Sequence, residues 1–302
     1  MLHPATGTGV YAPRLVGNQA IHQLSGHLAL RFESVEDRTR MHVLKQEPPW
    51  RVVRAFAQDN GSSLVHLHNV SGGVLSGDRL TLDIDVGPAS AAQVTTAGAT
   101  RLYRHREAAA DSEQHVKIHL GEGALLEYLP DALIPFAGSR HLQRTDVNLA
   151  DRATLLWWET VAPGRQAMGE TFAFDSLRLQ TEVRTESRPL LLENIFLEPA
   201  KRSPASQARL GAYTHTANFY AFAAGTPRSK WMELETKIND FCSARSIPGV
   251  MIWGASALAA DGIAVRGLSV SARDLPATLA DIWKITKLFL TGEHAVLPRK
   301  VY

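Results

Sequence analysis

The sequence predicts a mainly β fold of stacked sheets, with a smaller C-terminal part that carries two amphipathic helices. Three observations support this prediction. Apolar and polar residues alternate with a period of two through most of residues 20–199, as half-buried strands require. A strand-turn-strand layout recurs there at intervals of roughly 30 residues. Helical spacing of apolar residues appears only within residues 200–302. We expect residues 1–199 and 200–302 to form one continuous domain.

Seven segments of the β-rich region, residues 1–199, have the composition of strands. The clearest is Leu80–Val86, in which Leu, Ile and Val alternate with Thr and two Asp residues. Val116–Leu120 repeats this alternation with Lys and His at the polar positions. In chain order the seven segments are Gln19–Phe32, Leu64–Val70, Leu80–Val86, Val116–Leu120, Ala153–Val161, Thr171–Glu182 and Leu190–Leu197.

Three segments of the β-rich region share one layout of strand and turn. The segments IDVGPASAAQVTT, IHLGEGALLEYLP and VNLADRATLLWWE each consist of an alternating strand, a tight polar turn and a second apolar strand. Their turns follow Val86, Leu120 and Leu149. Repeated β units that cannot bury their faces alone are typical of stacked sheets or a solenoid. A β-sandwich with similar hairpins is the alternative.

The C-terminal part, residues 200–302, begins after a polar, proline-bearing loop, PAKRSPAS. Trp231, Leu234 and Ile238 have the spacing of one helix face. Asp274 fits the N-cap position of a second helix. The predicted elements are, in order, a strand at Tyr213–Phe222, a helix at Arg228–Ser246, strands at Val250–Leu258 and Ile263–Val270, and a helix that begins at Leu275.

Composition narrows the classes of function. The 32 Lys and Arg residues nearly balance the 30 Asp and Glu residues, giving a net charge of +2. Such a balance provides no basic excess for nucleic acid or for a membrane surface. The single cysteine, Cys242, excludes an internal disulfide and suits a reducing compartment. Without a secretory signal or an uninterrupted apolar run, we expect a soluble, cytoplasmic protein.

The glycine-rich segment GGVLSGD contains Gly72, Gly73 and Gly77 and ends at Asp78. Backbone N–H groups of such turns can bind anions. However, no Gly-Lys-Ser/Thr follows, the next element is a strand, and an acid stands where a phosphate would be repelled. We therefore interpret the segment as a β-corner in which glycine permits positive φ and close backbone packing.

Two pairs of histidines have the residue type that metal sites use. His66 and His68 lie two apart on a predicted strand and share one face, and neutral imidazole suits zinc or nickel. A third ligand is missing from the sequence pattern, so they are weak candidates. His115 and His119 are about 13 Å apart along a strand, which is too far to chelate one ion.

Paired acids would indicate a carbohydrate-active enzyme, because many such enzymes use two carboxylates. The candidates are Asp78, Asp83, Asp85, Glu127 and Glu159. Nothing in the sequence places two of them at the required separation. The chain also lacks a Gly-x-Ser-x-Gly motif, and Cys242 follows Phe241 in a predicted helix, where it is packed rather than reactive. We therefore expect no enzyme; a β-helical carbohydrate-active enzyme and a generic β-rich protein-binding module remain the alternatives.

Several short motifs follow one another in the order and spacing of a known family. They are GGVLSGD (72–78), TT (95–96), RLYR (101–104), LPDALIPFAGSR (129–140), WE (158–159) and GRQAMGETF (164–172). With its last helix and its basic, aromatic tail, the chain resembles the urease accessory protein UreD (UreH) family from about Gly26 to its end. Gly98 and Arg101 depart from the family, which often has Ala and Lys at these positions.

The resemblance implies a non-catalytic maturation protein for the nickel site of urease. It implies two stacked β-sheets wound in a β-helix-like (solenoid) manner and a small helical part. It further implies a scaffold between the urease apoprotein and a helical, UreF-type partner, through which a GTP-hydrolysing, UreG-type nickel carrier is recruited. Nickel passing along an internal polar channel would meet Asp78, Glu159 and Glu170, which lie in the matching motifs. No tightly bound cofactor is implied, because transit requires weak ligation.

Overall fold

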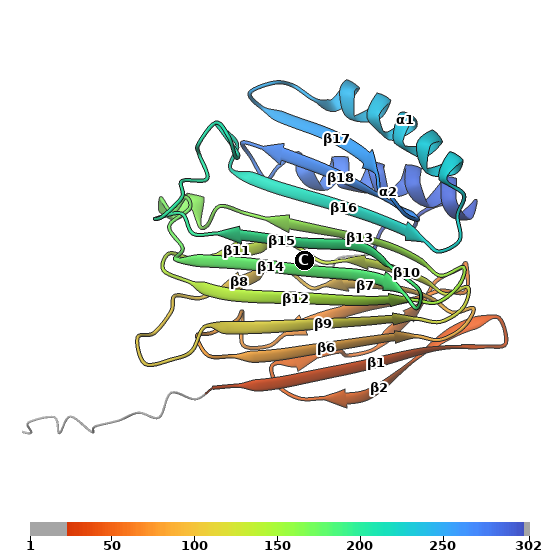
Figure 1. The fold of residues 1–302 in the computed structure, drawn as a ribbon. Coiled ribbons are helices and arrows are strands. Elements are labelled where there is room, and N and C mark those ends of the chain that lie inside the picture. Colours follow the sequence, from red (N-terminus) through yellow and green to blue (C-terminus); the bar gives the residue numbers. More distant parts are fainter. Residues whose placement is uncertain (1–22, 299–302) are drawn as a thin grey trace, which may run out of the picture.

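Two β-sheets stack on one another in this protein, and two helices cover the outer side of one sheet (Figure 1). A computed structural model of the chain describes residues 23–298. The mainly β class, the two sheets and the two helices expected from the sequence are confirmed. Among the described residues, no helix has the length and apolar character needed to cross a membrane.

The first sheet has, within residues 23–298, seven strands in the order β15-β14-β12-β9-β6-β1-β2. The five strands between the edges run parallel, and β2 and β15 pair antiparallel at the edges. Their bounds are β1 Ser25–Val35, β2 Arg38–Gln46, β6 Arg79–Val86, β9 Ser112–Leu120, β12 Arg140–Leu149, β14 Ser176–Thr185 and β15 Pro189–Leu197.

The second sheet has eleven strands in the described part of the chain, with the main order β17-β18-β16-β13-β10-β7-β5-β3. Strands β5, β7, β10 and β13 run parallel, and β16, β18 and β17 extend the sheet in antiparallel pairs. The bounds are β3 Trp50–Arg51, β4 Ala55–Ala57, β5 Ser63–Asn69, β7 Ala91–Thr96, β8 Thr100–Leu102, β10 Leu125–Leu129, β11 Leu133–Pro135, β13 Thr154–Val161, β16 His215–Ala223, β17 Met251–Ala257 and β18 Gly262–Ser269.

From β5 to β14 the chain passes repeatedly between the two sheets. Strands β6, β9 and β12 belong to the first sheet, and each is followed by a strand of the second, β7, β10 and β13. Val86 lies opposite Leu120, which in turn lies opposite Leu149. The three similar turns recognised in the sequence therefore stack in register, because each repeat unit adds one parallel strand to each sheet.

Both helices pack on the outer face of the second sheet. They are α1 (Arg228–Arg245) and α2 (Leu275–Thr291). Trp231 of α1 and Trp283 of α2 are buried in one cluster with Phe219 of β16. As a result, the second sheet is covered on both faces, by the first sheet on one side and by the helices on the other.

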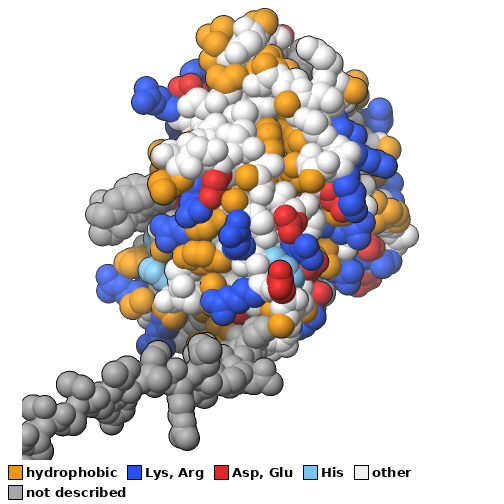
Figure 2. Space-filling model, turned by 90° about the vertical axis from the view of Figure 1, so that its left-hand side faces the viewer, with side chains coloured by type: hydrophobic (Ala, Val, Ile, Leu, Met, Phe, Trp, Pro, Cys, Tyr) orange, Lys and Arg blue, Asp and Glu red, His pale blue; other side chains and the backbone are white. Residues whose placement is uncertain are grey.

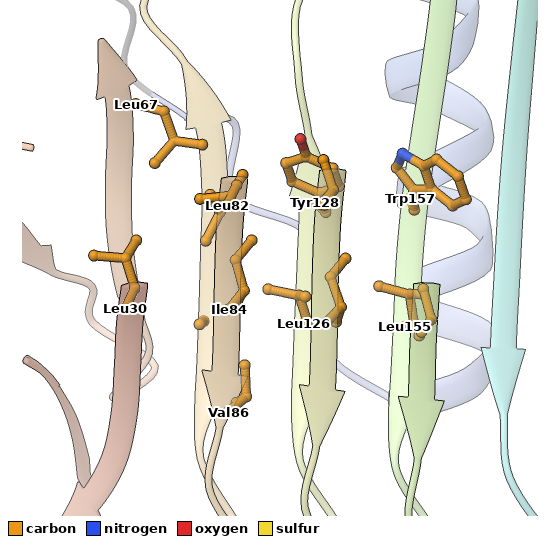
Figure 3. Packing of buried hydrophobic residues seen from close by; sticks show 14 of the residues in the cluster. Leu30, Leu67, Leu82, Ile84, Val86, Leu126, Tyr128, Leu155 and Trp157 are labelled. Carbon is orange, nitrogen blue, oxygen red and sulfur yellow. The ribbon is translucent and has the colours of Figure 1, made fainter. Parts of the chain in front are cut away.

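The space between the sheets holds the larger apolar core. Figure 3 shows side chains from both sheets meeting there, including Leu82 and Ile84 of β6, Leu126 of β10, and Leu155 and Trp157 of β13. All five are essentially inaccessible to solvent. Burying such side chains is the main source of folding free energy, at about 1.5–3 kcal/mol each.

Three local predictions need correction. The hairpin strand β2 was missed, because its exposed sequence RTRMHVLKQ has no clear alternation; residues 19–22 of the first predicted strand lie outside the described residues. The predicted strand from Thr171 begins only at Ser176, because residues 171–175 bond to a neighbouring loop through the Gly138 N–H and the Ala173 carbonyl. Asp274 occupies the N-cap position of α2, but its side chain makes no capping hydrogen bond.

Candidate functional site

Most of the motif residues gather at one end of the two-sheet stack. The bridge between Val74 and Leu102, the pairing of Leu102 with Pro135, and the bridge between Arg104 and Ser139 hold successive loops together. Figure 2 looks onto this end, where apolar side chains lie among charged ones. We call it the motif end; it consists of residues 70–78, 97–111, 130–139 and 162–175.

The glycines of GGVLSGD allow the first of these loops to pack closely on the second. Gly72 and Gly77 have φ values of +80° and +86°, which favour glycine. A Cβ atom at Gly73 would lie 2.5 Å from the Arg101 carbonyl oxygen and 2.6 Å from the Tyr103 ring. The turn therefore rests directly on the RLYR segment.

Asp78 ends this loop and is completely buried. Its carboxylate accepts hydrogen bonds from the backbone N–H groups of Leu75 (2.8 Å) and Leu24 (3.4 Å). Burial raises the pKa of Asp78 above its ordinary value, and the two backbone hydrogen bonds oppose that rise. The carboxylate thus fixes the corner from which β6 starts.

Glu170 joins two other loops of the motif end. It pairs with the Arg165 guanidinium and accepts a hydrogen bond from the Ala137 N–H at 3.1 Å. The guanidinium also lies 4.2 Å from the centre of the Phe136 ring. The hydrogen bond from Arg165 is the main reason why the pKa of Glu170 lies below its ordinary value. Glu170 is therefore an ionised acid whose charge is already compensated.

Glu159 has a different environment. It lies on the inner face of β13, is 6% exposed, and accepts a hydrogen bond from the Gln143 side chain across the two sheets at 2.8 Å. Burial, assisted by repulsion from Glu193, raises the pKa of Glu159 from 4.5 to about 7, and the Gln143 hydrogen bond opposes the rise. Among the described residues, the neighbours that shift its pKa include an acid and no base.

Glu159 belongs to a set of buried polar side chains between the sheets, close to the motif end. We call this set the polar interior. Its members besides Glu159 lie on the inner faces of β9 and β12 toward the start of each strand, whereas the later inward-facing residues of both strands are apolar, as at Ile118 and Val147. The polar interior consists of Ser112, Gln114, His141, Gln143, Thr145 and Glu159, all at most 8% exposed.

Comparison with known proteins agrees with the order of the motifs. A family model described as UreD urease accessory protein matches residues 24–302. The chain belongs to the UreD family. It is 42% identical to a protein named Urease accessory protein UreD from Herpetosiphon aurantiacus, over 93% of this chain and 98% of the relative. It is 31% identical to Urease accessory protein UreD 2 of Methylorubrum extorquens, over 87% of this chain and 84% of the relative.

In this UreD family member the three acids do not form one ligand set. Asp78 precedes β6 and binds backbone N–H groups, Glu170 precedes β14 and pairs with Arg165, and Glu159 binds Gln143 in the polar interior. Within residues 23–298 no group of three or more His, Cys, Asp and Glu side chains is arranged to hold a metal ion.

The weak candidates His66 and His68 lie elsewhere, on the outer face of β5. They line a groove of about 810 Å³ together with Phe56 and with Leu297 of the C-terminal segment. The His66 ring packs edge-to-face on Phe56 at 5.9 Å. The groove is therefore separate from the polar interior, which lies on the other side of the second sheet.

The sequence pattern alone does not identify His141 as a site residue. It is 3% exposed, and burial lowers its pKa from 6.5 to about 4, so the ring is neutral at neutral pH. The alternation His141, Gln143, Thr145, Val147, Leu149 contained the signal, because the two apolar members fix the inner face of β12. Because the first inward-facing residues of β12 are polar, the apolar–polar alternation that marks a strand is not visible at its start.

Proposed function

We propose that this UreD family member is a non-catalytic scaffold for inserting nickel into urease. In this proposal it bridges the urease apoprotein and a helical, UreF-type accessory protein, through which a GTP-hydrolysing, UreG-type nickel carrier is recruited. Family membership over nearly the whole chain supports the maturation role. The single cysteine supports assembly in the cytoplasm, because such a chain suits a reducing compartment.

The proposal includes a path for nickel through the stack, which we also propose to be β-helix-like because its parallel strands wind between two sheets. Glu159 is the observation that supports the path best, because a buried carboxylate without a cationic partner attracts a passing cation. Asp78 and Glu170 would shape the entrance, since their oxygens already bind backbone N–H groups or Arg165. Nickel would be cargo in transit and not a resident cofactor.

Exposed apolar side chains at the motif end support partner docking there. Val70 is 67% exposed and Met168 71% exposed. Ile247 is 58% exposed and lies at the same end. It bridges to Met251 at the start of β17, which pairs with Ser269 at the end of β18. Ser269 in turn pairs with the start of β16, which lies beside the end of β13 at the motif end. Apolar patches of this kind are typical of surfaces that a partner covers.

To test this proposal, the urease structural subunits are co-expressed with the other urease accessory proteins under three conditions. The first includes the wild-type chain, the second omits the chain, and the third includes the Glu159→Gln variant. Bound nickel and urea hydrolysis are measured in each case. We expect both to collapse without the chain, and to fall several-fold with Glu159→Gln while the accessory complex still forms. The matched control is Glu127→Gln combined with Lys287→Met, which removes a buried ion pair on the opposite face and should leave nickel loading normal. Equal nickel content with and without the chain would contradict the proposal.

A further inference from the structure

His141 has a nitrogen atom with no partner inside the protein. Ser112 donates its hydroxyl proton to the Arg140 carbonyl at 2.9 Å, so its oxygen is left to accept the hydrogen bond from His141 Nδ1, also at 2.9 Å. A neutral ring protonated on Nδ1 carries a lone pair on Nε2. That Nε2 atom is buried and makes no hydrogen bond to the described residues.

An unpartnered buried acceptor costs free energy and needs a reason. Here the ring is nearly inaccessible, its tautomer is fixed by Ser112, and burial keeps it neutral. Histidine ligands of metal ions are held in this way, with the second ring nitrogen donating to an oxygen that sets the orientation. The Ser112–His141 pair thus has the form of a ligand with its supporting hydrogen bond already in place.

The position of His141 relates it to Glu159. Gln143, two residues further along the same face of β12, is about 7 Å away along the strand and donates its hydrogen bond to Glu159. His141 is therefore one step nearer to the motif end than the level of Glu159. An imidazole nitrogen from the first sheet and a carboxylate from the second follow one another along the interior.

We propose that His141 Nε2 is a cation-selecting ligand, which favours borderline divalent transition-metal ions such as Ni²⁺ over Mg²⁺ and Ca²⁺ in the polar interior. This inference rests on the proposed passage of nickel. Carboxylates bind hard cations readily, so acids alone would not reject Mg²⁺, whereas neutral imidazole selects Ni²⁺, Cu²⁺ and Zn²⁺. One nitrogen followed by one carboxylate gives weak, sequential ligation, which passage requires.

The test uses the purified full-length chain with histidine side chains labelled with ¹⁵N. Because burial lowers the pKa of His141 to about 4, we expect its imidazole to be neutral and Nδ1-protonated throughout pH 6 to 8, as measured by NMR. Its signal should be absent in His141→Gln and displaced in Ser112→Ala, which assigns it even if the first variant folds poorly. Substoichiometric Ni²⁺ should broaden it, and excess Mg²⁺ should leave it unchanged. His119→Gln, at an exposed position of β9, is the matched control and should alter neither response.

Two results would overturn the inference. One is an Nε2-protonated ring at position 141, and the other is a signal that Ni²⁺ does not affect. Either result would leave the maturation role standing, because that role is judged by urease activation with and without the whole chain. Conversely, normal activation without the chain would overturn the maturation role whatever the NMR spectra show.

Discussion

Glu127 and Glu159 lie on neighbouring strands of the second sheet and are almost equally buried, at 2% and 6% exposure. They project from opposite faces. Glu127 points toward α2, where Lys287 donates to it at 2.5 Å and Gln93 at 3.1 Å. Glu159 points between the sheets and receives one hydrogen bond, from the neutral Gln143.

The difference shows how two buried acids in one sheet can have different roles, one structural and one chemical. A buried charge is tolerated when an opposite charge and hydrogen bonds compensate it. Lys287 does this for Glu127, so the pair ties α2 to the sheet. Nothing comparable in the described residues compensates Glu159, and burial shifts its pKa to about 7. Glu159 can therefore exchange a proton, or a proton for a metal cation, near neutral pH.

The largest effect is expected when the compensated pair is broken. Lys287→Met leaves Glu127 as an uncompensated buried charge and should lower the free energy of unfolding by about 3–5 kcal/mol, measured by urea denaturation. The double variant with Glu127→Gln should recover much of this loss, because no unpaired charge remains. If the single variant proves no less stable than the double variant, Lys287 does not compensate Glu127.

A smaller, pH-dependent effect is expected at Glu159. Because its pKa in the folded protein, about 7, is higher than 4.5, the folded state holds a proton that the unfolded state has lost. Stability contributed by this group is present below pH 4.5 and is lost as pH rises through 7, by about 3 kcal/mol in total.

The stability difference between wild type and Glu159→Gln isolates this contribution from that of His141, whose lowered pKa acts in the opposite direction below pH 6.5. Urea denaturation at pH 5, 6, 7 and 8 measures the difference. We expect wild type to lose stability relative to the variant across that range. A constant difference would show that Glu159 is ionised throughout.

The smallest effect is expected when the neutral side chain that donates a hydrogen bond to each acid is replaced, Gln143 for Glu159 and Gln93 for Glu127. Gln143→Leu removes a bond that favours the ionised form of Glu159 and should raise its pKa further, by about one pH unit. Carboxyl ¹³C NMR of labelled glutamate follows this titration. The matched change is Gln93→Leu beside Glu127, which keeps Lys287 as partner. It should leave the titration of Glu159 as it is in wild type, and a shift of that titration would remove the contrast.

Several features of the fold were predictable from particular residues. The alternation in Leu80–Val86 placed β6 correctly, and the repeated layout around the turns after Val86, Leu120 and Leu149 predicted stacked sheets, in which these turns lie in register. The helical spacing of Trp231, Leu234 and Ile238 identified the buried face of α1. These features depend on local periodicity, which the sequence carries directly.

The site was less accessible from the sequence. Asp78, Glu159 and Glu170 were named from family motifs, but each also binds a residue that is distant in sequence, namely Leu24, Gln143 and Ala137, respectively. His141 lay within a readable alternation, yet its free Nε2 atom depends on the Ser112 hydroxyl, 29 residues away. Which side chains pair with one another depends on tertiary packing, so these pairings produce no periodic pattern in the sequence.

The sequence by itself determined that the chain is mainly β, that three turns repeat, and that GGVLSGD with the motifs after it belongs to the UreD family. Only the tertiary structure decided that Glu127 and Glu159 face opposite sides, and that Lys287, 160 residues from Glu127, compensates just one of them. The physical reason is that β10 and β13 are buried on both faces. Apolar residues then occupy both sets of alternate positions, and the pattern no longer shows where an acid points.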